Sequence, residues 1–235
     1  MALPKLNNPT YELELPSTGE KIKYRPFLVK EQKILMMAQE SKNDNEMANA
    51  MGELCSSCTF GKVLPAKNPM FDLEYVFLKL RAKSVGEVAK VNIICPDDGK
   101  TEVPVEINID EIECQMLDKH TNEISLTEDI KIVLRYPYIF DMTNMPADIS
   151  EQNKVFELLN NCIVSVIDGD EIHQKTDMSE KELEEFVDSF TTEQFASVMD
   201  FFNSMPKVRH VVNITNPKTK KKSEVVLEGL QSFLG

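Results

Sequence analysis

Two segments of this chain have residue types and spacing that fit a chemical site, and both contain cysteine. Cys55 and Cys58 are separated by two residues, a spacing found in zinc sites and in redox pairs. Residues 95–99 read C-P-D-D-G, which resembles half of a zinc knuckle with Asp98 in place of the second thiolate. Because structural zinc takes four ligands, the candidate ligands Cys55, Cys58, Cys95 and Asp98 would have to converge from separate elements. The alternative is a helical cysteine pair with Cys58 in the core, and a turn shaped by its aspartate and glycine.

Redox chemistry at the cysteine pair is not favoured. A redox pair lies at a helix N-terminus, where the dipole lowers the pKa of the thiol. Cys55 and Cys58 fall at the C-terminal end of a predicted helix, where the dipole raises it. The chain has five cysteines and begins MALPKLNN, with no apolar signal-peptide core, so we expect reduced thiols in a cytoplasmic protein.

The sequence offers no recognisable constellation for nucleophilic catalysis or phosphate binding. The three histidines are His120, His173 and His210, and no Gly-x-Ser-x-Gly, His-Glu-x-x-His or Gly-rich phosphate motif accompanies them. The turn at 168–170 is not a calcium loop, because Ser179 stands where the twelfth position needs glutamate. We therefore predict no catalytic residues and no enzyme activity. An unrecognised hydrolase remains the least favoured hypothesis for the function of this chain.

A lysine-rich segment is the one local reversal of the chain's charge. The net charge is −13, yet four lysines fall within five residues: Lys218, Lys220, Lys221 and Lys222. These lysines fit contact with an acidic partner surface. The alternatives are a solvated hairpin loop, or a guard that keeps the hairpin edge from pairing. We name Lys220, Lys221 and Lys222 as candidate partner-binding residues.

Composition limits the function classes further. The chain has 235 residues, of which 42% are hydrophobic and 28% charged, enough apolar content for a real core. A net charge of −13 argues against a general nucleic-acid binder. No apolar run approaches the roughly 18 residues that a membrane helix needs. The sequence therefore predicts a folded protein with neither nucleic acid nor membrane as a partner.

Hydrophobic periodicity predicts the elements that position these residues. Period-two alternation indicates hairpins at 11–15 with 21–26, 88–94 with 103–109, and 208–214 with 223–227, and short strands at 112–116, 125–126 and 130–136. Helical spacing and capping patterns indicate helices at 29–41, 46–58, 69–86 and 151–166, another after Ser179, and another from Thr191 or Thr192 to Pro206. No fixed-period repeat is visible.

These elements predict the α+β fold class. We expect three consecutive regions: an N-terminal β-hairpin plus helices at 1–85, a small antiparallel β module at 86–140, and a mostly helical region with a C-terminal hairpin at 141–235.

The opening segment carries a family resemblance. Residues 4–41 read PKLNNPTYELELPSTGEKIKYRPFLVKEQKILMMAQES, in which a hairpin with oppositely charged strands leads into a helix. This segment resembles the amino terminus of the baseplate hub assembly proteins of T-even-type, contractile-tail bacteriophages. The resemblance is strongest over residues 3–41 and weaker beyond them.

The resemblance implies a non-enzymatic structural or assembly protein of a phage tail baseplate hub. It would be made in the cytoplasm of the infected bacterium and would bind other hub or tail proteins. The virion tail baseplate is a further expected location. It implies no cofactor. The alternative is a small zinc-binding adaptor or regulator. Tyr24 and Phe27, at the end of the first hairpin, are further candidate partner-binding residues, although their apolar faces fit an internal core equally well.

Overall fold

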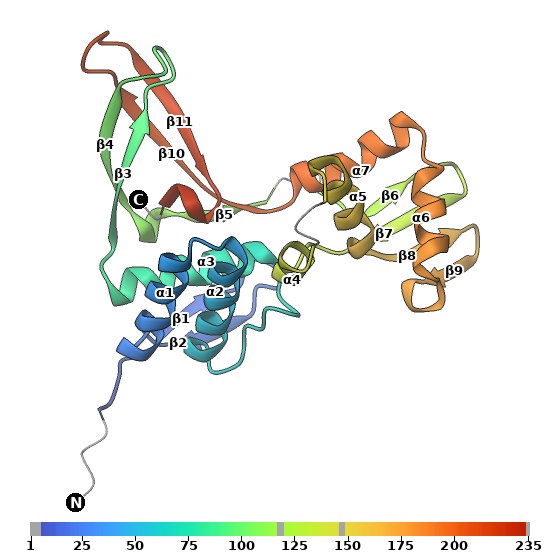
Figure 1. The fold of residues 1–235 in the computed structure, drawn as a ribbon, viewed down its shortest axis with the longest axis horizontal. Helices are drawn as coiled ribbons and strands as arrows, with labels where there is room; N and C mark the ends of the chain where they lie inside the picture. Colours follow the sequence, from blue (N-terminus) through green and yellow to red (C-terminus); the bar gives the residue numbers. More distant parts are fainter. Residues whose placement is uncertain (1–5, 117–119, 146–148, 234–235) are drawn as a thin grey trace, which may run out of the picture. The chain divides into compact units, whose positions relative to one another are not determined.

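The computed structural model describes residues 6–116, 120–145 and 149–233, and within them the chain forms two units (Figure 1). Unit 1 contains residues 1–115 together with 206–235, and unit 2 contains residues 116–205. Helices and small antiparallel sheets occur in both units. The predicted α+β class is confirmed.

Unit 1 begins with a two-stranded hairpin whose alternation sets one apolar face. Strands β1 (Tyr11–Glu14) and β2 (Lys21–Tyr24) pair antiparallel, with Leu13 opposite Ile22. Both of these side chains are buried, whereas Lys21 and Lys23 are exposed on the other face. Gly19 closes the turn at φ +69°, a backbone conformation that glycine adopts without steric cost.

Three helices pack beside this hairpin within unit 1. They are α1 (Val29–Ser41), α2 (Asp44–Cys58) and α3 (Met70–Ser84). The Asn43 side chain caps α2 by accepting hydrogen bonds from the N–H groups of Asn45 and Glu46. Helix α3 is the most buried of the three, and Leu73, Leu78 and Leu80 have no exposed surface. The predicted helices in this part of the chain are confirmed to within two residues at each end.

Two longer hairpins complete unit 1. The first is β3 (Val88–Ile94) with β4 (Glu102–Asn108), followed by a 3₁₀ turn, η1 (Ile109–Glu111), and β5 (Glu113–Gln115). The second is β10 (Lys207–Thr215) with β11 (Lys222–Glu228), followed by η3 (Leu230–Phe233). Figure 1 shows the two hairpins side by side, and each turns its alternate apolar residues inward.

Strand pairing explains why the units differ from the three predicted regions. β5 pairs with β10 in a sheet of order β11-β10-β5, which joins a strand ending at Gln115 to one beginning at Lys207. The C-terminal hairpin therefore belongs to unit 1, and the helices before it belong with the strands at 123–134 in unit 2. Consecutive segments could not show this, because long-range pairing leaves no local signal.

Unit 2 is a four-stranded antiparallel sheet with helices. The sheet order is β6 (Glu123–Ser125), β7 (Ile130–Leu134), β8 (Ile163–Asp168) and β9 (Glu171–Gln174). The helices are α4 (Ile139–Thr143), α5 (Glu151–Cys162), α6 (Glu180–Asp188) and α7 (Thr192–Ser204), and a 3₁₀ turn, η2 (Lys175–Asp177), precedes α6. The core lies between the sheet and α5, α6 and α7, with Ile132, Leu159 and Val198 fully buried.

The predicted helix at 151–166 is wrong in its last turn. Helix α5 ends at Cys162, and the following residues form β8, which pairs with β7. The segment Ile163-Val164-Ser165-Val166-Ile167 is rich in β-branched residues, which favour a strand. Ile163 and Val166 also fit the helical spacing of the preceding residues, although they lie in a strand. The short helix α4 was also not predicted, because five residues are too few to show a period.

Candidate partner-binding surfaces

A buried ion pair holds the first hairpin against the helices of unit 1. The guanidinium of Arg25 donates to the carboxylate of Glu31 at 2.9 Å, and the same carboxylate accepts the N–H of Leu28 at 2.7 Å. The backbone N–H of Arg25 donates to the carbonyl of Cys58, at the end of α2, at 3.0 Å. The Glu31 side chain is only 4% exposed. The Glu31 carboxylate and the Arg25 backbone therefore connect three elements: the end of β2, the start of α1 and the end of α2.

The environment of Glu31 sets its ionisation. Burial raises the pKa of this carboxyl, but hydrogen bonds from Arg25 and from the N–H of Leu28, with the positive charge of Arg25, outweigh burial and lower its pKa to about 2. The carboxylate is therefore charged at neutral pH and stabilises the folded state.

We expect this pair to make unit 1 acid-sensitive. The folded-state pKa lies below the unfolded value, so the stabilisation is complete above about pH 4.5 and is lost as pH falls towards 2. The loss should be about 3 kcal/mol, measured by urea unfolding between pH 2 and 6. Glu31→Gln should remove that part of the pH dependence. Equal pH slopes in the wild type and the variant would contradict the assignment.

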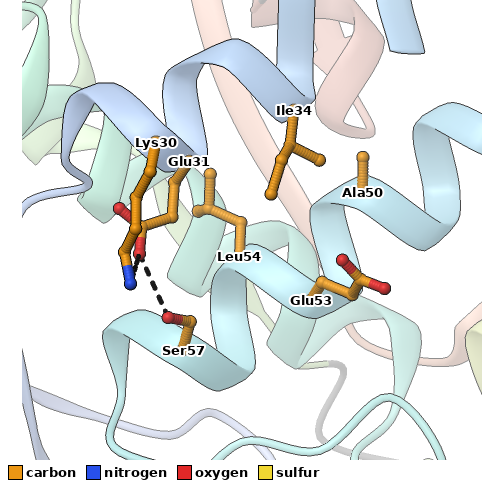
Figure 2. A pocket seen from close by; sticks show the side chains of 7 residues that line it. All are labelled: Lys30, Glu31, Ile34, Ala50, Glu53, Leu54 and Ser57. Atoms are coloured by element: carbon orange, nitrogen blue, oxygen red, sulfur yellow. Dashed lines mark hydrogen bonds and ion pairs between the residues drawn. The ribbon is translucent and has the colours of Figure 1, made fainter. Parts of the chain in front are cut away.

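A hollow lies between α1 and α2 beside the ion pair (Figure 2). It has a volume of about 170 Å³ and is lined by residues of the two helices: Lys30, Glu31, Ile34, Ala50, Glu53, Leu54 and Ser57. Figure 2 shows Ser57 and Lys30 both in contact with the Glu31 carboxylate at one end, and Ile34, Ala50 and the Glu53 carboxylate at the other. The hollow suits one apolar side chain with a polar neighbour.

Helix α1 extends this surface with an exposed apolar side chain, Met37, which is 70% exposed. Val29 and Met36 are also exposed, but they lie on the far side of the helix from Ile34. Met37 follows Ile34, which lines the hollow, by three residues, so the two lie on neighbouring positions of the helix surface. Methionine adapts to partner surfaces because its side chain is unbranched and polarizable. α1 and the hollow together are the candidate apolar docking surface of unit 1.

Tyr24 and Phe27 lie inside or close to the core rather than on this surface. Tyr24 is 3% exposed, and its ring packs against Tyr11 with centroids 5.6 Å apart. Phe27 is half-buried, and its N–H donates to the hydroxyl of Ser84. Tyr24 is thus assigned to the core, because it faces inward from β2, and a charge placed there would disturb folding. A partner contact at Phe27 stays a prediction.

The lysine-rich segment forms an ordered hairpin tip. Lys220, Lys221 and Lys222 are exposed, and Lys220 has φ +62°, an uncommon conformation for a residue other than glycine. The buried Asn216 accepts the N–H of Lys218 at 2.8 Å and donates to Asp97 at 3.0 Å. The β10–β11 tip is therefore bonded to the β3–β4 tip, and the lysines project from a fixed turn. Their contact with an acidic partner stays a prediction.

The four candidate zinc ligands lie at two different places. Cys55 and Cys58 are buried on α2, whereas Cys95 and Asp98 lie at the β3–β4 tip. The Asp98 carboxylate accepts hydrogen bonds from Thr101 and from Asn216. Burial raises the pKa of the Cys58 thiol to about 11, which opposes thiolate formation. Across residues 6–116, 120–145 and 149–233, no three His, Cys, Asp or Glu side chains are grouped so that they could hold a metal ion. We predict no metal, with zinc as the alternative, and neither is tested by the structure.

The histidines are likewise separate. His120 stacks on Tyr136 and lies 5.0 Å from the Phe201 ring, centroid to centroid, with Nδ1 2.9 Å from the Ser204 hydroxyl. His173 lies on β9 and His210 on β10. Burial lowers the pKa of His120, as expected for a neutral core ring.

The helices described also include none that is long and apolar enough to cross a bilayer.

Sequence reasoning missed the ion pair and the hollow. The available signal was Arg25 at the end of a strand with a glutamate six residues later, at the third position of a helix. That glutamate reaches back to the N-cap N–H, as in a capping box. Burial of the pair could not be read from the sequence, because both residue types are usually exposed.

The comparisons with known proteins define the class to which this chain belongs. Residues 8–235 match the family described as T4 bacteriophage base plate protein, so the chain is a member of that family. A curated relative is the baseplate hub assembly protein gp26 of Enterobacteria phage T4. It is 28% identical over 223 residues, which cover 95% of this chain and 97% of the relative. No solved structure matches the chain. The family resemblance of the opening segment is confirmed.

Proposed function

We propose that this chain is a non-enzymatic assembly protein of a phage tail baseplate hub, acting through contacts with other baseplate proteins. The observation that carries the proposal is the match to a baseplate hub assembly protein along almost the whole of both chains. The family match over residues 8–235 supports the same role. We further propose that the chain works in the host cytoplasm during assembly and reaches the tail baseplate.

The surface of α1 is the proposed site of these contacts. Met37, exposed on α1, lies beside a hollow of about 170 Å³, and an exposed apolar side chain beside a concave site is typical of protein interfaces. Lys30, at the Glu31 end of the hollow, is largely exposed and offers a charged contact at the rim. We expect the occupant to be an apolar segment of another baseplate protein.

Met37→Asp should weaken this association without unfolding the protein. The side chain is 70% exposed, so the change adds a charge to the docking surface and removes little buried area. We expect at least about a tenfold loss of affinity for co-expressed baseplate hub proteins of the same phage, a loss of about 1.4 kcal/mol.

The matched control is Met142→Asp, which replaces the same residue type on α4, where it is 49% exposed. It should leave affinity unchanged, and both variants should melt within about 2 °C of the wild type. Equal binding by the wild type and Met37→Asp would remove α1 from the interface. Failure of the wild type to bind any baseplate protein, with tails forming normally in its absence, would overturn the proposed function. Mass spectrometry of purified tails against lysate tests residence in the virion.

A further inference from the structure

Unit 2 repeats the arrangement found around Arg25 in unit 1. In each unit a hairpin ends at an arginine, a helix follows with a carboxylate at its third position, and a later helix ends at a cysteine. The unit 1 residues are Arg25, Glu31 and Cys58, and the unit 2 residues are Arg135, Asp141 and Cys162. The arginine and carboxylate are six residues apart in both cases.

The same hydrogen bonds connect these residues in both units. The backbone N–H of Arg135 donates to the carbonyl of Cys162 at 2.8 Å, as that of Arg25 donates to Cys58 at 3.0 Å. The Asp141 carboxylate accepts the Arg135 guanidinium and the N–H of Tyr138, its helix N-cap residue. Each arginine also donates to the carbonyl of the residue that follows it. β2 in unit 1 is therefore the structural counterpart of β7 in unit 2.

The two counterpart strands differ at their outer edges. β7 pairs with β6 on one edge and with β8 on the other, where Lys131 lies opposite Ile167 and Val133 opposite Ser165. Within the described residues β2 pairs with β1 alone. The backbone N–H and C=O groups of Ile22 and Tyr24 point towards β1, where they form the hydrogen-bonded pairs of the hairpin. The N–H and C=O groups of Lys21 and Lys23 therefore point to the outer edge of β2.

The described segment after Cys58 adds no strand to this edge, although Lys62 stays close enough to pair with Glu20 at 3.8 Å. After Cys162 the backbone continues directly into β8 along β7. After Cys58 it reverses at two residues with positive φ, Phe60 at +56° and Gly61 at +74°. Phe60, two residues after Cys58, is left 59% exposed. An exposed aromatic residue in an uncommon backbone conformation is the kind of side chain that a partner covers.

The charge of the edge indicates the chemistry of its occupant. Lys21 and Lys23 are exposed on the solvent face of β2, opposite Glu14 and Glu12 of β1, and Nζ of Lys23 lies 4.0 Å from Oε1 of Glu12. Residues directly opposite each other in an antiparallel pair share a face, so acidic side chains on an added strand would lie beside these lysines. Apolar side chains would alternate with them on the core face, beside Ile22.

We propose that the outer edge of β2 binds an extended acidic–apolar segment of another baseplate protein, antiparallel, in the position that β8 takes in unit 2. Main-chain hydrogen bonds to Lys21 and Lys23 would supply affinity, and the two lysines would select glutamate or aspartate. This proposal rests on the proposed function for the identity of the partner.

A synthetic peptide tests the edge directly. The probe copies residues 163–169 with glutamate in place of Ser165 and Ile167, the residues opposite the counterparts of Lys23 and Lys21. Fluorescence anisotropy with the full chain should show saturable binding that weakens with salt. Methylating the two glutamate backbone nitrogens should reduce affinity at least about tenfold, because those N–H groups face β2. Absence of saturable binding up to about 1 mM, or equal affinity of the methylated peptide, would overturn the proposal.

Variants of β2 complete the test. Lys23→Pro removes an outward N–H and leaves pairing with β1 intact, so it should abolish binding. Lys23→Gln is the matched control. It keeps the backbone N–H, so it should lose only the salt-dependent part of the affinity for the peptide. Should Lys23→Pro fail to fold, the methylated peptide still decides the question.

The two proposals fail in different ways. Capture of baseplate hub proteins by the wild type and by a folded Lys23→Pro variant alike would overturn the edge proposal and leave the proposed function standing. Capture of none by the wild type would overturn the proposed function, whatever the peptide does. A dimer of this chain that Lys23→Pro dissociates would show that a second copy, rather than another protein, occupies the edge.

Discussion

Replacing Arg135 by alanine should lower the free energy of unfolding of unit 2 by about 3 kcal/mol. The guanidinium donates twice to the Asp141 carboxylate, at 2.6 and 2.9 Å, and the carboxylate side chain is only 11% exposed. The substitution removes both of these bonds and leaves the carboxylate charge buried beside the backbone N–H of Tyr138. It also removes the hydrogen bond from Arg135 to the carbonyl of Tyr136. Urea unfolding followed by circular dichroism measures the change.

Arg135→Lys is the matched control for geometry. Lysine keeps the charge but cannot donate in parallel to both carboxylate oxygens, so about half of the loss should remain. The double variant Arg135→Ala/Asp141→Ala should be more stable than Arg135→Ala alone, because no buried charge is left without its partner. A loss below about 1 kcal/mol for Arg135→Ala would contradict the predicted contribution of the pair.

Phe201→Ala should have the largest effect of the core substitutions, about 4 kcal/mol. The side chain is 2% exposed and packs against three aromatic rings: His120, Tyr136 and Phe202, with centroids between 5.0 and 5.7 Å. Truncation removes the central ring of this cluster, and the stacked neighbours can close the cavity only in part. Chemical denaturation gives the stability change.

Phe140→Ala is the comparison that isolates burial. Phe140 lies on α4 of the same unit and is 38% exposed, so its truncation should cost less than about 1.5 kcal/mol. His120 should report the cavity as well, since the loss of Phe201 admits water and lets its pKa rise towards the ordinary value. Similar stability losses for the two phenylalanines would contradict the placement of the core.

Local pattern was sufficient for most of the elements. The opening hairpin and helix, α2, α3, α6 and α7 all carry apolar residues at a clear period, and polar caps begin several of the helices. The same reasoning went wrong at Ile163–Asp168, where β-branched residues also satisfied helical spacing. Only the antiparallel partner β7 distinguishes strand from helix there.

The repeated arginine arrangement shows a different limit. The two copies share an arginine, a carboxylate six residues later and a terminal cysteine, while the residues between them differ in type and number. The first copy places 26 residues between carboxylate and cysteine and the second places 20, so no fixed period relates them. Equivalence became visible through hydrogen bonds, which constrain backbone geometry and leave most side chains free to vary.

The sequence by itself determined the α+β class, the charge that argues against nucleic acid, and the resemblance to baseplate hub assembly proteins, because each depends on residue type or local order. The tertiary structure decided the rest. It joined β5 to β10, buried Tyr24, separated the cysteines of α2 from Cys95, and left the edge of β2 without a described partner strand. These outcomes depend on contacts between distant segments, whose free energy comes from packing and pairing that no single segment encodes. The cysteines that first suggested a metal centre are therefore assigned to positions on separate elements, and the exposed surface of α1 and the β2 edge take their place as the sites to test.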